Sequence, residues 1–216
     1  MASSDLWDEH AAASYEADSA EMFAPAAIDP AIAFLAEFAG DGAALAFAVG
    51  TGRLAIPLAR RGVPVVGIDL SPAMVDQLRT KASEVEVPVV VGDMASTHVP
   101  GDFTLVFLPF NSISNLRTQD EQVACFRNAA RHLVDGGYFV IELFVPPLRR
   151  LVPGDEAVLF DVSDAHVGFD TIDSVTQELS SHHFTREADG RFRYGVGNFR
   201  YIWPSECDLM AQLAGM

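Results

Sequence analysis

Between residues 43 and 144, short apolar runs alternate with segments of helical periodicity, and this alternation constrains the fold more than any other feature. Each apolar run ends near a Gly or an Asp. Strands that are apolar on both faces and alternate with helices are typical of a parallel sheet covered on both sides. The sequence therefore predicts an α/β fold. The predicted strands are 43–49, 64–69, 88–91, 103–107 and 138–144; the predicted helices are 52–61, 72–83 and 119–134, with a short turn at 113–116.

Different patterns flank this region. Residues 5–40 carry apolar stripes at helical spacing, which predicts two helices. Residues 157–202 contain alternating apolar and polar side chains around a turn at 188–190, which predicts an antiparallel hairpin or small sheet. A last helix is predicted at 208–214. The expected parts are N-terminal helices over 1–40, a core over 41–146, an antiparallel lid over 147–204 and a C-terminal helix over 205–216.

The charge balance narrows the class of partner. The 216 residues hold 14 Lys and Arg against 30 Asp and Glu, a formal charge of −16, and no basic residue precedes Arg53. A field of that sign repels phosphate backbones and anionic lipids, so we expect neither a nucleic-acid nor a membrane partner. The apolar runs fall short of the roughly 18 residues of a membrane span. The acidic start lacks the basic head of a secretory signal, and we expect a cytoplasmic protein.

Two glycines and an aspartate indicate a nucleotide-like cofactor. Gly50 and Gly52 lie where the first strand turns into a helix, so the backbone can approach a ligand there and the helix offers free N–H groups. Asp69 ends the second strand, where its carboxylate can accept hydrogen bonds from ribose hydroxyls. The glycines alone are a weak signal, and the combination with Asp69 is stronger.

Two cofactor classes fit these residues. The segment from Gly50 to Ala55 satisfies G-x-G-x-x-A, which is compatible with an NAD(P)-dependent oxidoreductase. The third strand favours another reading, because it ends at Asp93 and Met94, an acid that can bind the adenine amino group and a side chain that can pack on the ring. No Tyr-x-x-x-Lys occurs to handle a hydride.

The motifs in this order resemble the class I S-adenosylmethionine-dependent methyltransferases, which have a Rossmann-like parallel sheet. They are A-x-x-Y ending at Tyr15, A-V-G-T-G-R at the first turn, G-I-D-L-S-P-A-M, G-D-M, F-T-L-V-F-L-P-F-N-S, and H-L-V-D-G-G-Y-F-V-I-E. The following antiparallel segment and W-P-S-E helix resemble the members that act on small molecules, including amines and sugars.

The resemblance implies a role for each matching position, with S-adenosylmethionine as the cofactor. The glycine turn faces the methionine portion, the acid of the second strand faces the ribose, and the end of the third strand faces adenine. Backbone near the end of the fourth strand holds the cofactor's amino group, and Tyr15 closes over the sulfonium. The cofactor-binding residues implied in this way are Tyr15, Ala48, Gly50, Thr51, Gly52, Asp69, Leu70, Asp93, Met94 and Leu108.

The chain departs from the family pattern in two places. Ala46 stands where the first strand usually has an acid, and Ala48 where the first glycine of the turn usually is. We expect the missing acid to weaken cofactor binding. The two strands that usually follow the last helix also appear absent, as in a truncated or variant form. The fifth strand would then have an exposed apolar edge, which a second copy of the chain is a candidate to cover.

The proposed reaction is methyl transfer to a nitrogen or oxygen of a small molecule. Alignment of the nucleophile supplies most of the catalysis, and a base is needed for some nucleophiles. The candidate catalytic residues on the lid are His182, His183 and Tyr201, with Asn111 as an orienting group. No Cys or His spacing indicates a metal. The alternatives are a degenerate fold that acts as a non-catalytic binding or partner subunit and, less favoured, the oxidoreductase.

Overall fold

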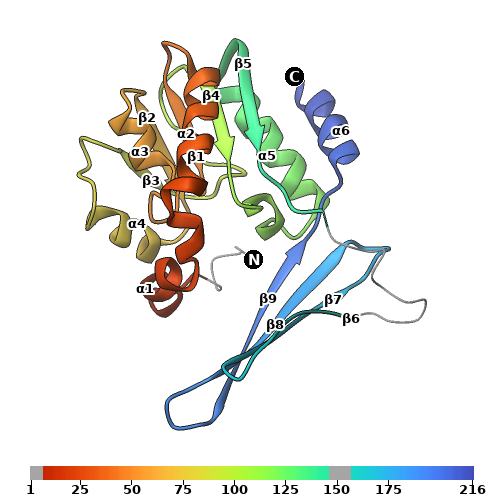
Figure 1. Ribbon diagram of the computed structural model, residues 1–216. Coiled ribbons are helices and arrows are strands. Elements are labelled where there is room, and N and C mark those ends of the chain that lie inside the picture. Colours follow the sequence, from red (N-terminus) through yellow and green to blue (C-terminus); the bar gives the residue numbers. More distant parts are fainter. Residues whose placement is uncertain (1–6, 146–156) are drawn as a thin grey trace.

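The computed structural model describes residues 7–145 and 157–216, and these form two sheets (Figure 1). Five parallel strands in the order β3-β2-β1-β4-β5 make the core sheet, as the alternation of strands and helices predicts. Its elements are α1 (Glu9–Asp18), η2 (Ala20–Phe23), α2 (Pro25–Ala39), β1 (Ala44–Phe47), α3 (Ala55–Arg60), β2 (Val65–Asp69), α4 (Pro72–Arg79), β3 (Val89–Val91), β4 (Phe103–Leu108), η3 (Ser112–Asn115), α5 (Gln119–His132) and β5 (Leu133–Ile141).

Both faces of the core sheet are covered, because alternate residues of β1 pack into two separate hydrophobic clusters. Ala44 and Ala46 belong to a cluster with Ile32 of α2 and Leu58 of α3. Leu45 and Phe47 point the opposite way, into a cluster with residues of α5 and with α6 (Pro204–Ala214). All four β1 residues are buried. This two-sided burial explains the continuous apolar runs in the sequence.

The second sheet is the lid. It has four antiparallel strands in the order β6-β7-β8-β9: β6 (Ala157–Val162), β7 (His166–Ile172), β8 (Glu178–Arg186) and β9 (Phe192–Arg200). The predicted turn at 188–190 joins β8 to β9. The sheet extends away from the core (Figure 1).

Several predicted boundaries were wrong: among the helices, the one predicted at 52–61 begins only at Ala55, and the one predicted at 72–83 ends at Arg79. The fifth strand begins at Leu133 rather than at 138 and ends at Ile141, because α5 already ends at His132. The apolar and polar alternation at 175–177 belongs to a turn, in which Gln177 has a φ of +64°, and β8 starts only at Glu178. The last helix begins earlier than 208, at Pro204. Local alternation and helical periodicity do not by themselves mark where backbone hydrogen bonding changes.

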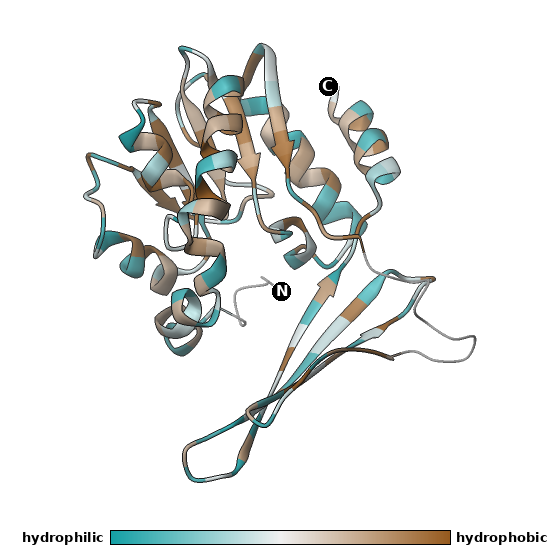
Figure 2. Ribbon diagram, viewed as in Figure 1, coloured by the Kyte–Doolittle hydropathy of each residue, from teal (hydrophilic) through white to brown (hydrophobic). Residues whose placement is uncertain are grey.

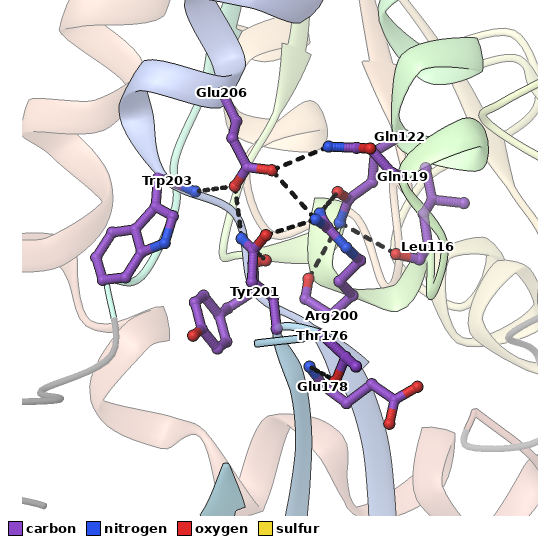
Figure 3. Close-up of polar contacts among 10 residues, drawn as sticks. Leu116, Gln119, Gln122, Thr176, Glu178, Arg200, Tyr201, Trp203 and Glu206 are labelled. Carbon is purple, nitrogen blue, oxygen red and sulfur yellow. Dashed lines mark hydrogen bonds and ion pairs between the residues drawn. The ribbon is translucent and has the colours of Figure 1, made fainter. Parts of the chain in front are cut away.

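A buried polar cluster joins the lid to the core (Figure 3). The side chain of Arg200, at the end of β9, donates hydrogen bonds to Gln122 of α5, to Gln177 and to Glu206 of α6. Gln122 in turn donates to the carbonyl oxygens of Leu116 and Arg200, both at 3.1 Å. Because these groups come from the lid and from both helices of one core face, the cluster fixes where the lid leaves the core.

The outer edge of β5 is open among the described residues, where β5 pairs only with β4. None of its nine residues is fully buried, and half of the Tyr138 side chain is exposed. That a second copy covers this edge stays a prediction. No helix among residues 7–145 and 157–216 is long and apolar enough to cross a membrane.

Candidate functional site

A cavity of about 450 Å³ opens at the carboxyl ends of the core strands. Trp7 and Tyr15 border it from the N-terminal segment, and Phe144 and Phe199 from the side of the lid. Parallel α/β sheets bind ligands at this edge. Of the ten residues implied to bind the cofactor, seven line this cavity: Tyr15, Ala48, Gly50, Asp69, Leu70, Asp93 and Met94.

The other three lie elsewhere. Thr51 lines a smaller adjoining cavity of about 40 Å³. Gly52 lines neither cavity; it has a φ of +85°, and a Cβ there would lie 2.6 Å from Cδ1 of Ile56, so only glycine fits the turn, and its role toward the cofactor stays a prediction. Leu108 is fully buried in the core and lines neither cavity.

The carboxylate of Asp69 ties the first turn to the second strand. Its Oδ2 accepts a hydrogen bond from the Gly50 N–H at 2.6 Å, and its Oδ1 accepts one from the Ser71 N–H at 2.9 Å. Burial raises the pKa of Asp69, and the two N–H groups oppose this shift. Asp69 therefore has a structural role in addition to lining the cavity.

The first turn is tight, and Ala48 takes part in it with a φ of +49°. Left-handed backbone is unfavourable for residues with a Cβ, by about 1–2 kcal/mol. The resemblance implies a glycine at this position, so Ala48 is a strained residue on the cavity wall, beside Gly50, whose φ is +58°.

The smaller cavity is lined by one cationic side chain, Arg53, and by three hydroxyl side chains, Tyr15, Thr51 and Ser112. Among the described residues, the buried Oγ1 of Thr51 has no hydrogen-bond partner. The guanidinium of Arg53 lies 5.5 Å from the ring centre of Phe110 and donates to the carbonyl oxygen of Met22 at 3.4 Å. Ala46 also lines this space and brings no charge. The orphan hydroxyl and the guanidinium fit a carboxylate, whereas Ala46 offers nothing to an ammonium group.

The N-terminal segment covers the cavity with aromatic rings. The ring of Tyr15 packs edge-on against those of Trp7 and Phe23, with centroid distances of 5.5 and 6.1 Å. The carbonyl oxygen of Trp7 accepts a hydrogen bond from the Ser71 hydroxyl at 2.6 Å, which attaches the segment to the core. Burial raises the pKa of Tyr15, so its hydroxyl stays protonated at neutral pH.

The opposite end of the cavity combines aromatic rings with neutral amides. Phe110, Asn111, Asn115, Phe144 and Phe199 line it. The Oδ1 of Asn111 accepts hydrogen bonds from the Phe144 N–H and the Ser114 hydroxyl, both at 3.0 Å, which fixes the orientation of this amide. The sequence indicates Asn111 as an orienting group and leaves Phe199 open between lid core and substrate platform. It assigns no role to Phe110, Asn115 or Phe144, which lie in loops or in η3.

None of the three candidate catalytic side chains lines the cavity. His182 and His183 are consecutive on β8, so they lie on opposite faces of the lid. Leu179 pairs with Phe199, and His183 follows on that face about 13 Å farther along the strand. Tyr201 is 2% exposed and packs against Trp203. Their catalytic role stays a prediction.

The described residues contain no group of three or more His, Cys, Asp or Glu that could hold a metal. His166 and His183 come within hydrogen-bond distance on the lid, at 3.0 Å, and Nδ1 of His166 lies 2.6 Å from Asp161. This pair faces the same side of the lid as Phe199, beyond the cavity.

Comparison with known proteins identifies the family. Residues 44–137 match the family model described as a methyltransferase domain. The CcbJ methyltransferase from Streptomyces caelestis is 36% identical and superposes with a TM-score of 0.75, over 86% of this chain and 76% of that one. The chain belongs to the class I S-adenosylmethionine-dependent methyltransferases. Its cofactor class is therefore S-adenosylmethionine, as the ordered motifs imply.

Other members of this methyltransferase family extend the comparison. The S-adenosylmethionine-bound CalS10 from Micromonospora echinaspora, an amino pentose methyltransferase, has the same fold at 23% identity and a TM-score of 0.67, over 87% of this chain and 80% of that one. A cypemycin N-terminal methyltransferase from Streptomyces is 31% identical over 106 residues, 49% of this chain and 43% of the relative. The chain spans about half the length of the curated relatives it matches, 43% and 64%.

Proposed function

We propose that this chain transfers the methyl group of S-adenosylmethionine to an amine nitrogen of a small molecule. The bound sulfonium would supply an already activated methyl group. The chain's task is then to bind the cofactor and to align a nucleophile. The observation that carries the proposal is the composition of the cavity end beyond Tyr15, where aromatic rings and neutral amides surround the space left for a substrate.

Cofactor binding would use residues on both cavities. Asp69 would accept hydrogen bonds from the ribose, Asp93 from the adenine amino group, and Leu70 and Met94 would pack on the ring. Arg53 and Thr51 would hold the carboxylate end in the smaller cavity. Tyr15 would cover the reacting end of the cofactor and exclude water from it.

The substrate end favours an amine over an alcohol. Among the described residues that line the cavity, the only carboxylates are Asp69 and Asp93, which the cofactor would occupy, and none is His or Lys. A hydroxyl needs a base to become a nucleophile, whereas a neutral amine already has a lone pair. An apolar cavity also lowers the pKa of an ammonium group, because burial disfavours the charged form. The name of the cypemycin relative, an N-terminal methyltransferase, is consistent with an amine target.

The test has two stages. Titration calorimetry with S-adenosylhomocysteine measures cofactor binding. If S-adenosylhomocysteine gives no heat of binding and NADH binds instead, the result contradicts the proposal and favours an oxidoreductase. Transfer of labelled methyl groups is then compared for matched pairs such as benzylamine and benzyl alcohol. We expect labelled amine and unlabelled alcohol. Labelling of alcohols alone contradicts the nitrogen target.

Ala46 favours a second candidate, a degenerate methyltransferase fold that serves as a binding or partner subunit. It leaves the smaller cavity without the acid that would anchor the cofactor's ammonium group. For a catalytic chain, Ala46→Glu changes cofactor affinity little, since Arg53 and Asp69 carry the binding. A large gain in affinity for S-adenosylhomocysteine in this variant, with no methyl transfer by the parent, supports the degenerate fold instead.

A further inference from the structure

One face of the lid carries apolar and aromatic side chains from all four strands. In the strand register, Leu159 lies opposite Phe169, Phe169 opposite His182, and His182 opposite Val196. Directly opposite residues share a face, and Phe199, which lines the cavity, lies on the other one. We call this surface the outer lid face; its central residues are Leu159, Phe169, His182, Phe184, Tyr194 and Val196.

The outer lid face is exposed as a continuous patch. Leu159, Val162, Phe192 and Tyr194 are each more than half exposed, from 51% to 65%. Their rings and those of their neighbours form rows, with centroid distances of 4.7 Å between Phe169 and His182 and 4.9 Å between Phe184 and Tyr194. Hydrophobic residues run along the lid strands in Figure 2, most evidently on β6. Single exposed hydrophobic residues are common, whereas a contiguous patch indicates an interaction surface.

The charges on this face are few and lie at its two ends. In a chain of formal charge −16, the register places one carboxylate on this face, Glu178 at the start of β8. It also places two arginines there: Arg186 at the other end of β8, and Arg200, which pairs with Glu178 but is 6% exposed because its guanidinium turns into the polar cluster at the core. Between these ends the described side chains of the face carry no Asp, Glu, Lys or Arg. Neither Glu178 nor Arg186 forms an ion pair with another described residue.

We propose that the outer lid face binds the same face of a second copy of this chain, with the two β8 strands antiparallel. A two-fold axis between the sheets, crossing β8 at His182, brings Glu178 of each copy opposite Arg186 of the other. The interface is then self-complementary in charge as well as in hydrophobicity. An uncharged centre places no carboxylates of the two acidic chains directly against each other.

The size of the face suits a stable dimer. Nine residues of β8 and four strands give a footprint of about 30 by 19 Å. This is the scale of a standard interface, which buries roughly 800 Å² of accessible surface per partner. Face-to-face packing of two antiparallel sheets is also a common arrangement in proteins.

Sedimentation velocity of the full chain, from low to high micromolar concentration, tests the proposal. We expect the mass to rise from 23.3 kDa toward twice that value. Tyr194→Asp places a carboxylate at the centre of both faces and should weaken dimerisation by roughly tenfold or more. Leu213→Asp, at a residue of α6 that is 62% exposed, is the matched control and should leave the dimer unchanged.

A charge exchange tests the antiparallel pairing itself. Glu178→Arg would set two arginines against each other and weaken the dimer, and adding Arg186→Glu should restore it. Any other arrangement or partner gives no such rescue. Because both positions are exposed, circular dichroism should report an unchanged fold. A monomer at every concentration overturns the proposal, as does a dimer that survives Tyr194→Asp, that is lost in Leu213→Asp, or that the charge exchange fails to restore.

Discussion

The two sheets of this methyltransferase differ in which part of a strand carries the chemistry. In the core sheet, both faces are buried and the groups that line the cavity lie at the strand ends, where Gly50, Asp69 and Asp93 meet at one edge. In the lid, the strands are long and partly exposed, and the two faces differ. One face carries Phe199 toward the cavity, and the other is the outer lid face. A function placed at strand ends leaves short local motifs, whereas a function placed on a face depends on register.

The largest effect that separates the two sheets is expected at Arg200. Removing the Arg200 side chain leaves Glu206 partly buried without its cation. Breaking a buried ion pair in this way costs about 3–5 kcal/mol, and this pair is nearly buried, with side-chain exposures of 8% for Arg200 and 17% for Glu206. In Arg200→Ala, hydrogen exchange should accelerate in β8 and β9 while β1 keeps its protection. Equal acceleration in both sheets would show that the lid has no separate anchor. Arg191→Ala, at the exposed lid turn, is the control.

A leucine-to-alanine substitution in each sheet compares how much stability a side chain contributes in the core and in the lid. Leu45→Ala empties a fully buried core position and should cost about 2–5 kcal/mol. Leu159→Ala, at a side chain 56% exposed, should change the unfolding free energy by less than about 0.5 kcal/mol. Thermal unfolding at concentrations where the chain is monomeric measures both. A loss at Leu159 as large as that at Leu45 contradicts an exposed lid face.

Asp69→Ala tests whether the core holds the cofactor at its strand ends. The substitution removes a buried acceptor of two N–H groups and a proposed ribose partner, and hydrogen bonds to charged groups contribute about 1.5–3 kcal/mol each. We expect S-adenosylhomocysteine to bind about a hundredfold more weakly in calorimetry. Asp41→Ala, at an exposed aspartate remote from the cavity, should bind as the parent does. An unchanged affinity in Asp69→Ala removes Asp69 from the binding site.

The smallest expected effect is a difference in pH response. Burial raises the pKa of Asp69, whereas for Glu206 the burial penalty is outweighed by hydrogen bonds from the Trp203 N–H, Gln177 and Arg200, which lower its pKa. Cofactor affinity should therefore begin to decline at a higher pH than it would with an unperturbed aspartate, whereas the polar cluster around Arg200 should persist to a lower pH than it would with an unperturbed glutamate.

The stability contributed by the polar cluster around Arg200 should depend on pH through the carboxyl group of Glu206. Because the folded pKa of Glu206 is depressed, its contribution to stability is full above the unfolded value of about 4.3 and is lost as pH falls through the folded value. The difference in unfolding free energy between the parent and Glu206→Gln should therefore shrink only below about pH 4. A difference that is already lost above about pH 4.3 contradicts a depressed pKa for Glu206.

The sequence predicted the core well because its signals are local. Asp69, Asp93 and Gly50 each follow an apolar strand within a few residues, and parallel strands bring their ends together. The polar cluster around Arg200 had no such signal, since Gln122, Gln177 and Glu206 are far apart in the chain. The faces of the lid depend on a register that spans 157–200 and includes an irregularity between Leu159 and Asp161.

The chain has two tryptophans, one at the cavity of the core and one at the polar cluster that joins the lid to the core. Trp7 lines the cofactor cavity. Trp203 packs on Tyr201, and its backbone N–H donates to Glu206 at the lid anchor. Intrinsic fluorescence therefore has one emitter in each region. In Trp7→Phe the remaining emission would report the lid anchor alone, and in Trp203→Phe it would report the cavity, so that ligand entry and lid movement can be timed separately without an added label.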